Sequence, residues 1–73
     1  MVEYDDNLEA WLSLSDRLVS QISEEKARLE ELNEEALQNF DDFGILAKQV
    51  VVQTKIKTLE QVHTQVTLTI INL

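Results

Sequence analysis

The sequence predicts an all-α protein in which two long antiparallel helices form a coiled-coil helical hairpin. The 73 residues include no proline and one glycine, whereas a strand-rich fold of this size needs several tight turns. The one break in the pattern falls near Gly44, and apolar residues on both sides of it recur every three or four positions. We therefore expect a single helical-hairpin domain over residues 1–73.

The first helix is expected from about residue 6 to about residue 39. Asp5, Asp6 and Asn7 are good N-cap residues, and their charges complement the positive end of a helix. Strong helix formers, mostly glutamates, fill the positions between the apolar residues. Those apolar positions are Leu8, Trp11, Leu12, Leu18, Val19, Ile22, Leu29, Leu32, Ala36 and Phe40. Their face is broad as far as Ile22 and narrow beyond it.

The turn is expected at residues 40–44. Gly44 can adopt a positive φ, and Asp41 or Asp42 can cap the helix that follows. Phe40 and Phe43 bracket this turn, so we expect their rings to pack over the end of the hairpin.

The second helix is expected from about residue 45 to about residue 71. Residues at alternating spacings of four and three form a heptad seam: Ile45, Gln49, Val52, Ile56, Leu59, His63, Val66, Ile70 and Leu73. The propensities of the individual residues favour a strand instead of a helix, because valine and threonine are frequent in this segment. Alternation from Val62 to Ile70 leaves a second possibility, a helix followed by a β-hairpin whose turn would fall near residues 58–61.

The hairpin core is expected where the two apolar stripes meet. The first helix contributes Leu29 and Leu32. The second contributes Val52, Ile56, Leu59, Val66 and Ile70.

Composition excludes several classes of function. The net charge of −8 argues against nucleic acid and anionic membranes as partners. Residues 1–43 hold thirteen acids and three bases, whereas residues 44–73 hold one acid and three bases. No apolar run reaches the length of a membrane span, and the acidic N-terminus does not resemble a signal peptide, so we expect a soluble cytoplasmic protein without membrane insertion.

The sequence offers no candidate catalytic or cofactor site. Cysteine is absent and there is one histidine, which leaves no metal site and no cofactor to expect. The neighbouring glutamates, such as Glu24 and Glu25, cannot form acid–base pairs because adjacent helical residues face different directions. His63 falls on the seam, where it is expected to pack. We do not expect an enzyme.

Two helices alone leave apolar residues uncovered, which predicts a protein partner or self-association. The expected partner-binding residues are Leu8, Trp11, Leu12, Val19 and Ile22, on the broad face of the first helix. Trp11 has two interpretations: it caps the hairpin core, or it anchors the partner, since tryptophan is frequent in binding hot spots. One alternative is that two hairpins pair as a homodimeric four-helix bundle, acting as a scaffold or regulator.

Two short segments carry a resemblance to a known family. Leu8-Glu9-x-x-Leu12 opens the first helix, and Lys57-Thr58-Leu59-Glu60 precedes a β-branched run to Leu73. In these segments and in its overall plan, the chain resembles the small co-chaperones of bacterial type III secretion needle subunits, the YscE-like family. The resemblance implies a hairpin that pairs with a larger tetratricopeptide-like chaperone. Together they would keep the needle subunit monomeric in the cytoplasm, a role in bacterial virulence.

Overall fold

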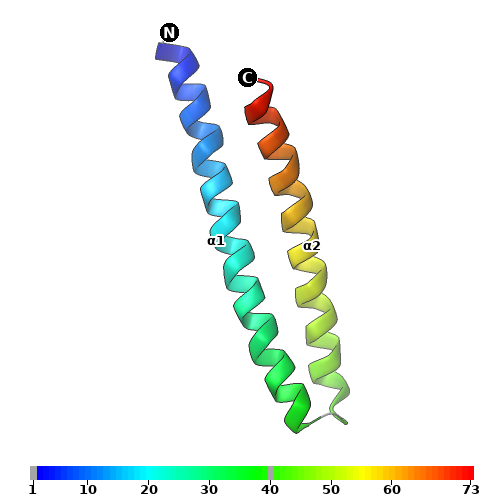
Figure 1. Cartoon of the computed structure of the whole chain (residues 1–73). Coiled ribbons are helices and arrows are strands. Elements are labelled where there is room, and N and C mark those ends of the chain that lie inside the picture. The colour runs from blue at the N-terminus through cyan, green and yellow to red at the C-terminus, as the bar shows by residue number, and fades with distance from the viewer. Residues whose placement is uncertain (1, 40) are drawn as a thin grey trace.

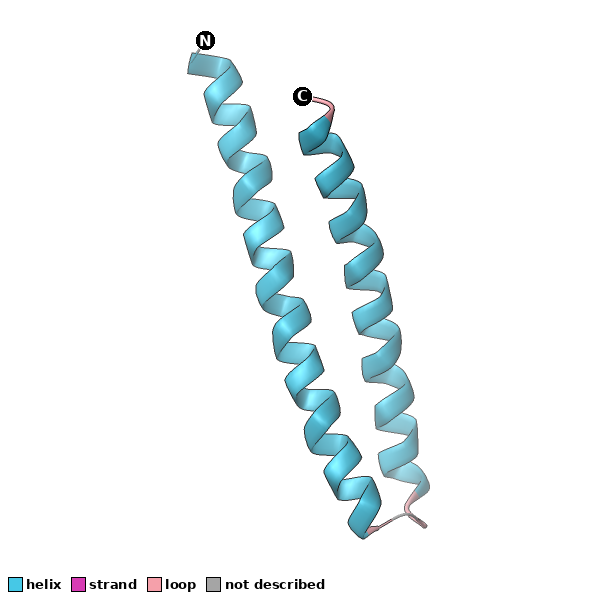
Figure 2. Ribbon diagram, viewed as in Figure 1, coloured by secondary structure: helices cyan, strands magenta, loops and turns pink. Residues whose placement is uncertain are grey.

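The chain folds into two long helices that run antiparallel, side by side (Figures 1 and 2). The computed structural model describes residues 2–39 and 41–73, with side chains from Asn7 onward. Helix α1 spans Val2–Gln38 and helix α2 spans Phe43–Ile71. No strand occurs in the described ranges. The predicted all-α hairpin is confirmed, and the alternative of a β-hairpin with its turn near residues 58–61 is wrong, because that segment lies inside α2.

Helix α1 begins earlier than the sequence suggested. Its backbone is helical from Val2, so Asp5, Asp6 and Asn7 lie inside the helix and do not cap it. At the other end, the Asn39 N–H donates to the Glu35 carbonyl at 2.9 Å, which extends the hydrogen-bond pattern just past Gln38. The predicted start near residue 6 was therefore late by about one turn.

Asp42 is the N-cap of α2. Its side chain accepts hydrogen bonds from the N–H groups of Gly44 at 2.8 Å and Ile45 at 3.4 Å. The predicted positive φ at Gly44 is wrong, because Asp42 turns the chain in an extended conformation with φ −86° and ψ 101°. A Cβ at position 44 would lie 3.0 Å from Asp42 Oδ1, so glycine leaves room for the capping carboxylate.

The aromatic residues of the turn do not both pack as expected. Phe43 is 80% exposed, so the prediction that its ring covers the end of the hairpin is wrong. It occupies the first position of α2, immediately after the cap. Phe40 lies outside the described residues.

We expect Asp42→Ala to lower the free energy of unfolding by about 1 kcal/mol, because two N–H groups of the first turn lose their acceptor. Urea denaturation followed by circular dichroism measures this. Asp41→Ala removes a neighbouring exposed carboxylate without touching the cap and serves as the control. Equal effects of the two substitutions would contradict the assignment of the cap.

Helix α2 accommodates its threonines through hydrogen bonds to its own backbone. The hydroxyls of Thr54, Thr64, Thr67 and Thr69 each donate to the carbonyl four residues earlier, at 2.9–3.0 Å. These bonds satisfy the hydroxyls inside the helix, although such residues are neutral or unfavourable helix formers in isolation. Packing against α1 therefore has to supply much of the stability of α2.

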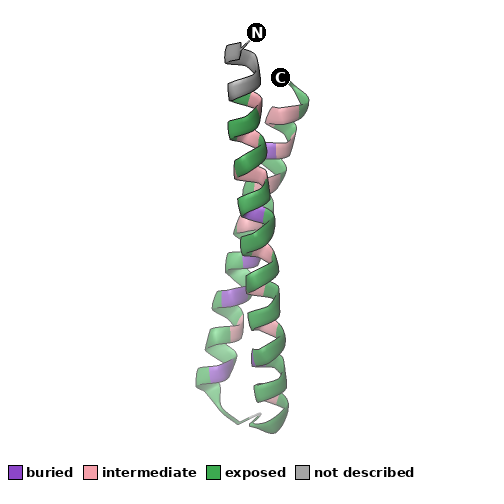
Figure 3. Ribbon diagram, turned by 90° about the vertical axis from the view of Figure 1, so that its left-hand side faces the viewer, coloured by how far each residue is buried: buried purple, intermediate pink, exposed green. Residues whose placement is uncertain are grey.

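The hairpin is long and thin. Its principal extents are 58 × 14 × 13 Å, and its radius of gyration is 16.8 Å, compared with about 11 Å for a compact chain of this length. Buried and half-buried positions recur at intervals along each helix, and the remainder is largely exposed (Figure 3). Neither α1 nor α2 has the length and apolar character needed to cross a membrane.

Candidate partner-binding surface

The two helices meet along a heptad seam. In α1 the seam residues, all buried or half-buried, are Leu8, Trp11, Ser15, Leu18, Ile22, Glu25, Leu29, Leu32 and Ala36. In α2 they are Ile45, Gln49, Val52, Ile56, Leu59, His63, Val66 and Ile70. Both series advance by alternating steps of three and four, as in a coiled coil.

The centre of the seam is a small apolar cluster. Leu32, Val52 and Ile56 are buried together, and Leu29 packs against them. The other expected core residues, Leu59, Val66 and Ile70, also lie on the seam and are buried or half-buried. Leu73 was expected on the seam but is 48% exposed, because α2 ends at Ile71.

A polar layer crosses the seam toward the open end of the hairpin. Ser15 Oγ lies 3.2 Å from His63 Nε2, and both side chains are half-buried. The sequence placed His63 on the seam but did not single out Ser15, because a serine does not contribute to an apolar pattern. Alternating steps of four and three residues place Ser15 on the seam between Trp11 and Leu18.

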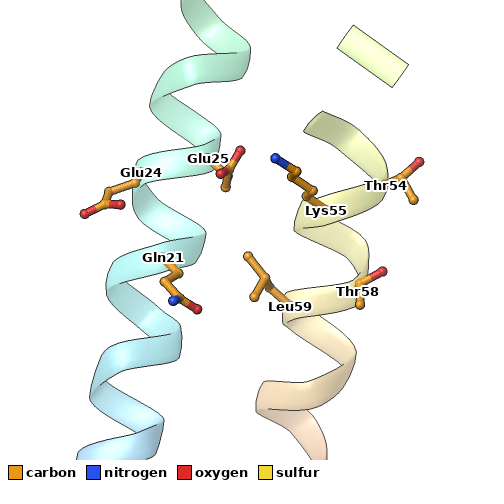
Figure 4. A pocket seen from close by; sticks show the side chains of 7 residues that line it. All are labelled: Gln21, Glu24, Glu25, Thr54, Lys55, Thr58 and Leu59. Carbon is orange, nitrogen blue, oxygen red and sulfur yellow. The ribbon is translucent and has the colours of Figure 1, made fainter. Parts of the chain in front are cut away.

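Glu25 is the second polar seam residue of α1 that the apolar pattern missed. Its Oε2 is buried and has no hydrogen-bond partner among the described residues. Figure 4 shows the Glu25 carboxylate and the Lys55 amine directed toward one another across a groove, while Glu24 points away. Thr58 and Leu59 are among the residues that line this groove, which encloses about 480 Å³. The carboxylate has lost water on one side without gaining a partner, which costs stability.

The contacts between the helices define two broad faces of the hairpin. On the first, Lys26 Nζ lies 3.7 Å from Glu60 Oε2, and Gln49 Nε2 donates to Asn33 Oδ1 at 2.7 Å. We call this side the Lys26 face. The opposite side, the Lys55 face, carries grooves lined by both helices, with Arg28, Lys48 and Lys55 among the lining residues.

Most of the large exposed apolar side chains belong to the Lys26 face. Within each helix, the positions reached from Lys26 or from Glu60 by alternating steps of three and four residues lie on this side. The exposed apolar residues at such positions are Leu12, Val19 and Leu37 on α1, and Phe43, Leu46, Val50 and Ile71 on α2. Val51 and Val62, by contrast, fall on the Lys55 face.

The predicted partner-binding residues divide into two groups. Leu8, Trp11 and Ile22 are half-buried on the seam, where their side chains face α2. Leu12 and Val19 are 45% and 51% exposed and lie on the Lys26 face. These two expose the larger fraction of their side chains while the hairpin stays intact.

The described residues contain no group of three or more His, Cys, Asp or Glu side chains placed to hold a metal ion. The grooves are open depressions along the surface, lined by charged side chains together with polar and apolar ones. The exposed apolar side chains of the Lys26 face are the candidate binding surface.

Comparison with known proteins adds no relative. No family model matches the sequence, and neither a curated protein nor a solved structure shows significant similarity to the chain.

Proposed function

We propose that this chain is a small helical binding module, not an enzyme, that completes its fold by covering the Lys26 face with another protein. The observation that carries this is the run of exposed apolar side chains on that face. Monomeric proteins seldom leave such a surface uncovered, and extended apolar patches commonly mark binding sites. At the open end the patch includes Leu12, Val19 and Ile71, each at least 45% exposed.

We further propose that the module serves as a co-chaperone in the bacterial cytoplasm. The resemblance to the YscE-like family motivates this, with a larger tetratricopeptide-like chaperone and a type III secretion needle subunit as the partners. A two-helix rod has too little surface to enclose a needle subunit alone, so stabilising the larger chaperone is the more plausible task. Helix-in-groove contact would use anchors at three- and four-residue steps.

The test is co-expression with a tetratricopeptide-like chaperone and needle subunit from the same secretion gene cluster. We expect the tagged chain to co-purify with both proteins. For the double variant Leu12→Asp, Val19→Asp, we expect the yield of the co-purified complex to fall at least about tenfold. The same variant should keep its helical circular dichroism, because neither residue is on the seam.

Val51→Asp, Val62→Asp places two acids on the Lys55 face and is the matched control. We expect it to leave the complex intact. If both double variants bind equally well, the Lys26 face is not the partner site. If the wild-type chain recovers neither protein, the co-chaperone role is wrong. Trp11→Ala is a poor probe, because Trp11 also packs on the seam.

A further inference from the structure

The Lys26 face carries a second heptad pattern, separate from the seam. On α1 its positions are Leu12, Asp16, Val19, Ser23, Lys26, Glu30, Asn33 and Leu37. On α2 they are Phe43, Leu46, Val50, Gln53, Lys57, Glu60, Thr64, Thr67 and Ile71. Both again advance by alternating steps of three and four, the spacing that a neighbouring helix requires.

From this pattern we propose that a second copy of the chain covers the Lys26 face when the larger partner is absent, so that self-association and the proposed function use the same surface. The two hairpins stack face to face and antiparallel, so that the open end of each lies on the turn end of the other. The axis of two-fold symmetry runs between the two hairpins, at the level of the middle of both helices. Each α1 then lies along the α1 of the second copy, and each α2 along the second α2, in a four-helix bundle.

The α2 pattern is self-complementary about a point between residues 58 and 59. Lys57 of one copy then meets Glu60 of the other, and the reciprocal pair forms by symmetry. Farther out, Leu46 meets Ile71. These two side chains are 41% and 71% exposed in the single hairpin. Opposite charges therefore meet at the centre, and apolar side chains meet at both ends.

The α1 pattern is self-complementary about residue 28. Lys26 of one copy meets Glu30 of the other, and Val19 meets Leu37, which is 83% exposed in the single hairpin. Asp16 falls opposite the turn of the second copy. The two midpoints lie at nearly the same level of the hairpin, since the Lys26–Glu60 ion pair brings residues 26 and 60 together. One two-fold axis can therefore serve both helices.

The exposed area agrees with one such interface per chain. The hairpin exposes 5759 Å², whereas a compact monomer of 8.4 kDa would expose about 4,600 Å². The excess, about 1,100 Å², is comparable to the roughly 800 Å² that each partner loses in a standard interface. Most of the remaining acids of α1, such as Glu24 and Glu31, lie off the Lys26 face, which limits repulsion between two acidic chains.

Disulfide cross-linking tests this arrangement directly, because the chain has no cysteine of its own. Leu46→Cys and Ile71→Cys are prepared as separate single variants and mixed in a glutathione redox buffer. Positions 46 and 71 lie about 38 Å apart along one helix, so a disulfide between them must join two chains. We expect the mixture to form the 46–71 cross-linked dimer, and each variant alone to form at least about tenfold less.

Other outcomes overturn the antiparallel arrangement. Efficient cross-linking of either variant with itself would show hairpins aligned with their open ends together. No cross-linking in the mixture, with a monomeric mass by sedimentation, would show that the Lys26 face does not bind a second copy. The mixture of Val51→Cys and Val62→Cys, on the Lys55 face, gives the background from random collision. These measurements need no other protein, so their failure is distinct from failure of the co-chaperone role.

A charge reversal provides a second test. We expect Lys57→Glu to weaken self-association about tenfold, because it places two glutamates together twice at the symmetry axis. Lys55→Glu, the same change on the opposite face, should alter it by less than about twofold. Equal dissociation constants for the two variants would contradict the central pairing of Lys57 with Glu60.

Discussion

Replacing Ile56 by alanine is expected to lower the free energy of unfolding by about 3 kcal/mol. Ile56 is 8% exposed and belongs to the buried cluster with Leu32 and Val52. Truncation removes apolar contacts and leaves a cavity that two rigid helices cannot close. A domain of this size has a net stability of only about 4 to 11 kcal/mol. The variant should therefore unfold at a urea concentration well below the midpoint of the wild-type transition. Urea denaturation monitored by circular dichroism measures the change.

A matched pair on the same helix serves as the control. Val52→Ala and Val51→Ala remove the same atoms at adjacent positions that are 4% and 54% exposed. We expect a loss of about 2 kcal/mol for Val52→Ala and within about 0.5 kcal/mol for Val51→Ala. Similar losses at both positions would mean that the seam does not hold the hairpin together.

Replacing Glu25 by leucine is expected to raise the free energy of unfolding by about 1 to 2 kcal/mol. The substitution removes a carboxylate oxygen that is buried without a partner and adds an apolar side chain opposite Leu59. Leucine is also a strong helix former, so the backbone of α1 is not penalised. The gain in the free energy of unfolding is measured by the shift of the midpoint of urea denaturation, provided that the slope of this free energy against urea concentration is unchanged.

The neighbouring residue gives the control for Glu25. Glu24 is exposed and its carboxylate is directed away from α2 (Figure 4), so Glu24→Leu should change stability by less than about 0.5 kcal/mol. A loss of stability in the Glu25→Leu variant would show that the carboxylate is paired in solution, with Lys55 as the nearest candidate. In that case Lys55→Ala should cause a similar loss.

The fold was predictable because helix geometry fixes the spacing of a seam. The positions from Ile45 to Ile70 follow from the three–four pattern, and the structure places all of them at the helix interface. The valines and threonines of α2 pointed to strands, but packing along the seam and hydrogen bonds to backbone carbonyls outweigh that local preference. A single-residue propensity carries no information about a partner helix.

The turn and the polar seam residues were harder to foresee. Gly44 suggested a left-handed turn, whereas the chain turns at an extended Asp42 whose carboxylate needs the space beside that glycine. Ser15 and Glu25 occupy seam positions but are polar, so counting apolar residues missed them. Their roles depend on contacts with α2 that only the folded hairpin reveals.

Predicting the binding surface requires knowledge of how the two helices are rotated relative to one another, which the sequence does not provide. Sequence alone grouped Leu12 and Val19 with Leu8, Trp11 and Ile22. The Lys26–Glu60 contact shows which sides of α1 and α2 coincide, and so separates the exposed residues from the seam. Only after that step do the apolar and charged positions of the Lys26 face form a self-complementary pattern.

The most direct test of whether a second copy covers the Lys26 face is the dependence of the melting temperature on protein concentration. If a second chain covers the Lys26 face, unfolding is coupled to dissociation. The melting temperature should then rise by several degrees between about 5 and about 500 μM, with a sedimentation mass approaching twice 8.4 kDa. A melting temperature that stays constant over this range, with the mass of a single chain throughout, would contradict the cover of this face by a second copy.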